Sequence, residues 1–172
     1  ICGKNNIPVW FEPTSVFKSC KVFESEPDLS YITYISPNIY ELEKMADYVK
    51  QKMSFSSDMH SSIIKSVHGD RFEKEKENII SLLYSGIHYI VTTMGPDGTL
   101  LGYRNGDIVD MESIKFIHFP APPADVIQVN GAGDAMAGCC ISSIVSGKTI
   151  EESILIGHAC AKLQLETKPL TQ

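Results

Sequence analysis

Several features that would assign a protein to a class at once are missing from these 172 residues. No apolar run approaches the ~20 residues that a membrane-spanning helix needs, so we expect no membrane contact. No dense stripe of Lys and Arg occurs either. With 15 basic against 21 acidic residues the net charge is −6, which argues against nucleic acid as a partner because a phosphate backbone would be repelled. Repeats and low-complexity linkers are also absent, so we do not divide the chain into separate domains.

The cysteines lack the spacing of a metal site or of a framework of disulfides. The count is odd, no Cys-x-x-Cys pair occurs, and two of the five are adjacent. We therefore expect reduced thiols that serve as small core residues, which favours a reducing, cytoplasmic compartment. The histidines outside the last helix share no spacing that would indicate a metal site. The cysteines are Cys2, Cys20, Cys139, Cys140 and Cys160, and these histidines are His60, His68, His88 and His118.

Extended and helical segments alternate along the chain. Runs rich in β-branched and aromatic residues predict strands at 7–11, 31–35, 87–93, 99–103 and 114–119. Helices are predicted from Asn38 to about 53, from a cap at Asp70 to Gly86, from Asp134 to about 145, and from a Thr149–Glu152 capping box onward. Residues 54–69 fit either a helix or a long exposed loop. The alternation predicts an α/β fold, with a layered, parallel-type sheet and helices on both faces.

The segment from Val126 to Gly138 carries the strongest chemical signal. We interpret 126–129 as an apolar strand that enters a turn of small residues, Gly131-Ala132-Gly133, and then a helix. Such a turn directs backbone N–H groups into one concavity, where the helix dipole adds positive potential, so it suits an anion such as phosphate. Asp134 competes with that anion unless it accepts a proton from an attacking hydroxyl.

Other interpretations of this segment exist. Asp134 could simply stabilise the helix dipole, and the glycines could serve only a tight strand–helix turn. The dinucleotide fingerprint fails because Met136 stands where its third glycine belongs. A Walker loop fails because Gly147-Lys148-Thr149 has Ser142, not glycine, five residues upstream.

Asn130-Gly131-Ala132-Gly133-Asp134, followed by small residues, resembles the C-terminal signature of the ribokinase-like (PfkB) sugar and nucleoside kinases. Three more segments match that family in order: Asn38-x-x-Glu41, then 93–98 (Thr-Met-Gly-Pro-Asp-Gly), then the approach at 119–126. The resemblance covers nearly all of residues 1–172. It implies a ribokinase-like fold and transfer of a γ-phosphoryl group from ATP, with Mg²⁺, to a primary alcohol of a small sugar or nucleoside.

The resemblance also implies roles for individual residues. Asp134 would be the catalytic base, and Gly131, Ala132 and Gly133 would form an anion hole. Asn38 and Glu41 would organise Mg²⁺ and phosphate, although the pair also reads as a helix cap. Nucleotide would contact Thr93, Gly95, Asp97, Gly98 and His158. The glycine turn would equally serve any hairpin, and a lone histidine in an apolar helix is more often packed than ligand-binding.

One departure from the family pattern narrows the resemblance. Many members carry Asp-Thr-Thr before Gly-Ala-Gly-Asp, and that Asp helps to bind a monovalent cation. This chain has Gln128-Val129-Asn130, which counts against a K⁺ site of the usual kind. The pattern is closer to that of pseudouridine kinases, so pseudouridine is the favoured substrate.

Family kinases are about twice this length, and their N-terminal half supplies most of the acceptor site and a β-lid through which a homodimer could form. Nothing before Ile7 corresponds to these parts, and the chain begins at Ile1 rather than Met. We therefore expect the C-terminal part of a kinase, inactive when isolated. The alternatives are another PfkB sugar kinase, or a non-catalytic relative that keeps the fold as a binding or assembly module.

Overall fold

The computed structural model describes residues 2, 5, 7–25, 29–52, 57–106 and 112–168, except the side chains of 57–60. The chain divides into two compact units. Unit 1 comprises Ile1–Met94 and Leu100–Ile117, and unit 2 comprises Gly95–Thr99 and His118–Gln172.

A mixed five-stranded sheet lies in unit 1, except that Thr99, His118 and Phe119 at the ends of its last two strands are counted with unit 2. Its order is β1 (Trp10–Phe11), β2 (Tyr34–Ile35), β3 (Tyr89–Thr93), β4 (Thr99–Arg104) and β5 (Ile114–Phe119). The pairs β1–β2 and β2–β3 are parallel. Only the 3₁₀ turn η2 (Gly95–Asp97) joins β3 to β4, which is too short for a parallel crossover, so these strands form an antiparallel hairpin. The α/β prediction is confirmed, and the parallel part of the sheet is limited to its first three strands.

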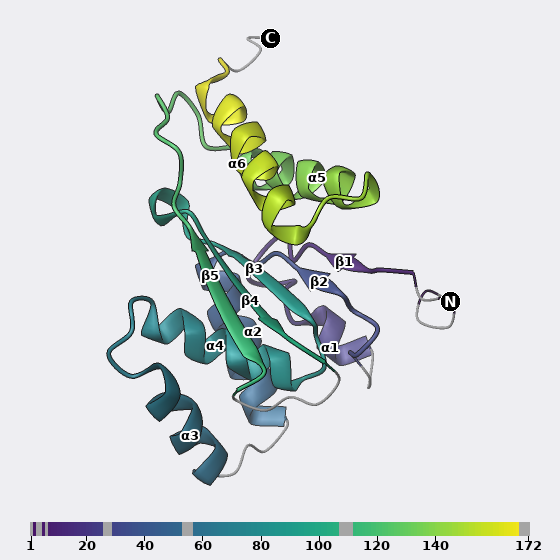
Figure 1. Cartoon of the computed structure of the whole chain (residues 1–172), viewed down its shortest axis with the longest axis vertical. Coiled ribbons are helices and arrows are strands. Elements are labelled where there is room, and N and C mark those ends of the chain that lie inside the picture. Colours follow the sequence, from purple (N-terminus) through teal and green to yellow (C-terminus); the bar gives the residue numbers. More distant parts are fainter. Residues whose placement is uncertain are drawn as a thin grey trace. The chain divides into compact units, whose positions relative to one another are not determined.

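Two helices cover one face of this sheet. Besides α1 (Lys21–Ser25) and α3 (Ser57–Val67), unit 1 has α2 (Ile39–Lys52) and α4 (Glu73–Tyr84), which lie side by side against β3 (Figure 1). Their apolar faces meet strand residues in a core that excludes water, with Ile35, Leu42, Ile79, Leu83 and Ile90 at 0% exposure. Gly102 permits the close approach of α4, because a Cβ there would lie 2.3 Å from Ile79 Cγ2.

Aromatic rings line the other face of the sheet. Trp10, Tyr34, Tyr89 and Tyr103 lie on consecutive strands and stack in sequence, with ring centroids 5.2, 5.0 and 5.6 Å apart. Side chains alternate between the two faces of a strand, so these rings stand opposite the buried Ile35 and Ile90. Cross-strand aromatic pairs of this kind support the register of short strands.

Unit 2 is built on a helical hairpin of α5 (Ala132–Val145) and α6 (Ile150–Glu166). The predicted stop at Gly147 is confirmed: its φ is +86° and its N–H donates to Ile144 O. The Thr149–Glu152 capping box is confirmed as well. Gly157 lets the helices pack closely, since a Cβ there would lie 2.6 Å from Cys140 Sγ.

Two local predictions are wrong. Asp70 does not cap α4; the N-cap is Phe72, at φ 64°, and the Asp70 carboxylate pairs instead with Lys76 Nζ at 2.8 Å. Residues 126–129 do not form a strand. The N–H groups of Ile127 and Gln128 donate to Leu165 O at the end of α6, so β-forming side chains there are held by a helix end rather than by a neighbouring strand. Of the undecided segment 54–69, residues 57–67 are helix α3.

The prediction of five reduced thiols is also wrong. Cys139 on α5 and Cys160 on α6 form a disulfide, while Cys2, Cys20 and Cys140 are free. The two partners are 21 residues apart in sequence, and only the folding of one helix back along the other brings them together. The expectation of a reducing compartment rested on five reduced thiols, and the disulfide removes that basis. Among the residues described, no helix is both long and apolar enough to cross a bilayer.

The disulfide can be tested by thiol labelling. Denatured protein treated with an alkylating reagent should take up label on Cys2, Cys20 and Cys140 only, and on all five cysteines after reduction. Mass spectrometry of the peptides that contain Cys139 and Cys160 is the measurement. Label on these two residues before reduction would contradict the cross-link.

Candidate functional site

The predicted anion hole lies at the start of α5 in unit 2. Gly131 is the N-cap, with φ 79° and ψ 0°, a left-handed conformation that only glycine adopts without strain. The first bond within the helix runs from Ala135 N to Gly131 O at 2.9 Å. The N–H groups of Ala132, Gly133 and Asp134 therefore precede the helical ladder and have no acceptor within it. No side chain caps this end of the helix.

Gly133 and Asp134 are exposed beside these N–H groups. A Cβ on Gly133 would meet nothing within 4 Å, so packing within the described part of the chain does not require glycine at this position. The Asp134 side chain stands in the first turn of α5, where a carboxylate also compensates the helix dipole. The turn can thus accept an anion, with a carboxylate next to it.

The predicted nucleotide turn joins β3 to β4. Gly95 and Gly98 both have positive φ, +57° and +89°, but their surroundings differ. A Cβ on Gly95 would meet nothing within 4 Å, whereas one on Gly98 would lie 2.1 Å from Phe119 O and 2.5 Å from Ala121 N. Gly98 is therefore required by the backbone beside it. Asp97 is exposed, and its carbonyl lies 2.6 Å from His118 Nε2.

Asn38 and Glu41 lie together in unit 1, where they cap α2 reciprocally. Asn38 Oδ1 accepts from the N–H groups of Tyr40 and Glu41 at 2.9 and 3.0 Å, and Glu41 Oε2 accepts from Asn38 N at 2.9 Å. Asn38 also bridges to Thr93 at the end of β3, so three predicted site residues are neighbours. The capping geometry is the structural alternative that the sequence left open, and the metal-organising role stays a prediction.

His158 is a buried residue of α6, 7% exposed. Its Nε2 lies 2.8 Å from the hydroxyl of Thr99, the first residue of β4. Burial, and secondarily the nearby His118, lowers the pKa of His158, so the ring is neutral at physiological pH. The burial of His158 and its contact with Thr99 give it a structural role within unit 2. Contact of His158 with a nucleotide stays a prediction.

Sequence reasoning missed the residues of α6 that hold the turn. Gln164 Nε2 donates to Asn130 O at 3.1 Å, directly before Gly131. Lys162 and Glu166, an i,i+4 pair, contact the loop that leads to this point. The i,i+4 spacing was the available signal, but it predicts an ordinary surface ion pair and names no loop partner. No group of three or more His, Cys, Asp or Glu side chains suited to a metal ion occurs in the part of the chain described.

Comparison with known proteins identifies the family to which this chain belongs. The model of the pfkB family carbohydrate kinases matches residues 2–171. The chain belongs to this family. Its members are phosphotransferases that use ATP. The match spans the candidate anion-binding turn at Gly131–Gly133, Asp134 and the Asn38–Glu41 pair.

The relatives of this pfkB-family chain are nucleoside and sugar kinases. It is 29% identical to a pseudouridine kinase of Arabidopsis thaliana, over 97% of this chain and 52% of the relative. It is 26% identical to a pseudouridine kinase of Escherichia coli, over 93% and 42%. The structure of Arabidopsis thaliana ribokinase complexed with ribose and ATP aligns with a TM-score of 0.65 at 20% identity, over 97% and 44%, which shows a ribokinase-like fold. The chain spans about half the length of these relatives.

The two glycines of the hairpin turn should respond differently to alanine. Gly95→Ala should cost about 1 kcal/mol, the strain of a left-handed residue with open space around it. Gly98→Ala should cost on the order of 4 kcal/mol or more, because its Cβ meets backbone that cannot move alone. Urea unfolding of the purified variants is the measurement. Equal costs would show that the contact with Phe119 and Ala121 does not constrain Gly98.

Proposed function

We propose that this chain is the nucleotide- and phosphate-binding part of a kinase that transfers the γ-phosphoryl group of ATP to a primary hydroxyl of a nucleoside. The observation that carries the proposal is the turn at Gly131–Gly133, with N–H groups that have no acceptor in the helix, followed at once by exposed Asp134. Membership of the pfkB family supports the choice of phosphoryl transfer over simple anion binding.

The chemistry asks the protein mainly to position groups and to stabilise charge on phosphoryl oxygens. The N–H groups of Ala132, Gly133 and Asp134 would donate to those oxygens with no rearrangement of the backbone. The Asp134 carboxylate would accept the proton of the acceptor hydroxyl as that oxygen attacks phosphorus. The proton moves to the carboxylate, the bond from phosphorus to the leaving oxygen breaks, and ADP leaves.

The residues present fit ATP and Mg²⁺. The exposed, uncapped helix end suits a phosphate, and Gly133 leaves open space beside it. Mg²⁺ bound with ATP would neutralise phosphate charge, and such ions keep several waters and need only one or two protein carboxylates. Glu41 uses one carboxylate oxygen in the cap of α2, and a carboxylate has further acceptor positions, so capping leaves room for a role toward a metal-bound water. A K⁺ site of the usual kind is not part of the proposal, since the side chain of Gln128 donates to Thr167 O.

For the acceptor we propose pseudouridine. Two relatives that match almost the whole chain are pseudouridine kinases. Gln128-Val129-Asn130 also differs from the Asp-Thr-Thr of many sugar kinases and is closer to the pattern of pseudouridine kinases. An adenosine kinase of Schizosaccharomyces pombe is 23% identical over 98% of this chain, which makes adenosine the second candidate. Phosphotransfer by the full-length protein to pseudouridine, adenosine and ribose, compared as kcat/KM, tests the choice. A preference for adenosine would overturn pseudouridine and keep the kinase.

Asp134→Asn tests the carboxylate in the full-length protein. The amide keeps shape and hydrogen bonding but removes the basic oxygen, so kcat should fall by about 10²–10⁴-fold while KM for ATP holds or decreases. The matched control is Glu151→Gln, which removes a first-turn acid from α6 and should leave kcat unchanged. Near-normal turnover of Asp134→Asn would mean that Asp134 only compensates the helix dipole, and would favour a non-catalytic binding module.

Gly133→Ala and Gly138→Ala form a matched pair on α5. Neither Cβ would meet any atom within 4 Å, so both substitutions should raise stability, by up to about 1 kcal/mol. A helical Cβ leans toward the N-terminus, so only Gly133→Ala places a methyl group where a phosphate would approach. We expect a raised KM for ATP and a lower kcat for Gly133→Ala, with normal kinetics for Gly138→Ala. Normal kinetics for both variants would count against phosphate at this turn.

A further inference from the structure

The loop before the anion-binding turn has no regular structure of its own. Residues 120–131 belong to no helix or strand, although they fix where Gly131 and the following N–H groups lie. A backbone segment of this kind needs external partners for its polar groups. The end of α6, residues 162–166, and its C-cap Thr167 supply them.

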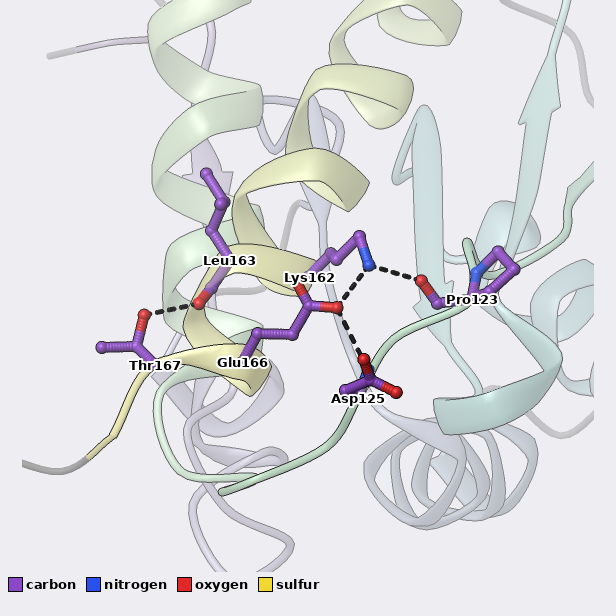
Figure 2. A network of polar contacts seen from close by, with 6 residues as sticks. All are labelled: Pro123, Asp125, Lys162, Leu163, Glu166 and Thr167. Atoms are coloured by element: carbon purple, nitrogen blue, oxygen red, sulfur yellow. Dashed lines mark hydrogen bonds and ion pairs between the residues drawn. The ribbon is translucent and has the colours of Figure 1, made fainter.

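An ammonium group and a carboxylate hold the first part of the loop (Figure 2). Lys162 Nζ donates to Pro123 O at 2.6 Å and also contacts the carboxylate of Glu166. The same Glu166 oxygen accepts from Asp125 N at 3.1 Å. The Lys162 ammonium and the Asp125 N–H lower the pKa of Glu166, so this carboxylate stays charged at neutral pH. Each of the two side chains therefore bonds both to the other and to loop backbone.

Backbone and amide contacts hold the rest of the loop. Leu165 O accepts from the N–H groups of Ile127 and Gln128 at 2.8 and 3.1 Å. Gln164 Nε2 donates to Asn130 O at 3.1 Å, and it would lie 3.3 Å from a Cβ on Gly131. The Asn130 carbonyl and the Gly131 N–H belong to one planar peptide group, so the Gln164 bond fixes the orientation of the peptide that enters the turn.

We propose that Lys162, Gln164 and Glu166 are positioning residues that hold the anion-binding turn in the geometry for phosphoryl transfer. This inference rests on the proposed function. These side chains touch the loop and not the reacting atoms, so they act through the direction of the N–H groups at 132–134. Electrostatic stabilisation of a transition state depends on such directions, and a misplacement of about 1 Å can cost about 100-fold in rate.

The test uses the full-length protein and replaces the polar groups of Lys162 and Gln164 by an apolar side chain of similar length. Lys162→Met and Gln164→Met should lower kcat about 10- to 100-fold and change KM for ATP much less, because the turn remains present but is displaced. Amide hydrogen exchange should become faster in peptides that cover residues 123–134. Lys162→Arg keeps a donor for Pro123 O and Glu166, and should restore most of both readouts.

Lys148→Met is the matched control. Lys148 is also a lysine with an i,i+4 carboxylate partner, Glu152 at 3.9 Å, but at the opposite end of α6. The Lys148→Met variant should keep kcat, KM for ATP and hydrogen exchange at residues 123–134 at wild-type values. A purely stabilising role for Lys162 would instead lower the melting temperature without a selective loss of kcat in the folded protein.

The outcomes separate this proposal from the proposed function. Wild-type protein that transfers no phosphoryl group overturns the kinase assignment, and hydrogen exchange alone then decides whether α6 positions the turn. Unchanged exchange at residues 123–134 in Lys162→Met and Gln164→Met overturns the positioning role. Faster exchange with unchanged kcat in an active enzyme also overturns it, since the tether would then have no effect on the reaction.

Discussion

The candidate anion-binding turn at Gly131–Gly133 depends on hydrogen bonds that its own loop cannot make. Residues 120–131 lie outside any ladder, and the last four carbonyl groups of a helix also lack partners. In unit 2 the unpaired groups of the loop and of the helix end bond to each other. Leu165 O, near the end of α6, accepts from both Ile127 N and Gln128 N, and Gln128 Nε2 donates to Thr167 O. The loop satisfies the helix end and the helix end holds the loop.

The same helix is anchored at several points along its length. Its N-terminus carries a reciprocal capping box, and the middle of α6 packs against α5 where Gly157 lacks a side chain. Cys160 links α6 to Cys139, and His158 meets the Thr99 hydroxyl at the start of β4. Because α5 begins at the turn and the end of α6 contacts residues 123–130, the α5–α6 hairpin holds the loop both along its length and at its C-terminal end.

Sequence reasoning succeeded where the cause of a structure is local. The 114–119 strand has the predicted bounds, and the Thr149–Glu152 box and the Gly147 stop are where turn and cap chemistry put them. It failed where the structure of a segment is decided by residues far away in the sequence. Residues 126–129 have strand-forming side chains but find a helix end as neighbour, and Cys139 meets Cys160 only because the chain reverses between them. The prediction for Asp70 was wrong because Phe72, whose carbonyl accepts the first helical hydrogen bond from Lys76 N, takes the cap position.

The site shows the same division between residues that the fold itself explains and residues that it does not. Gly98 has an internal reason to be glycine, since backbone at Phe119 and Ala121 fills the space of a side chain. Asn38 and Glu41 have one as well, because each caps the other's backbone. Gly133 has none among the described residues, and a helical glycine costs about 0.5–1 kcal/mol relative to alanine. Gly138 shares these open surroundings, so the lack of an internal cause alone does not single out Gly133. What distinguishes Gly133 is its place beside N–H groups that lack acceptors in the helix and beside an exposed carboxylate, and this supports the proposal that a phosphate approaches the backbone there.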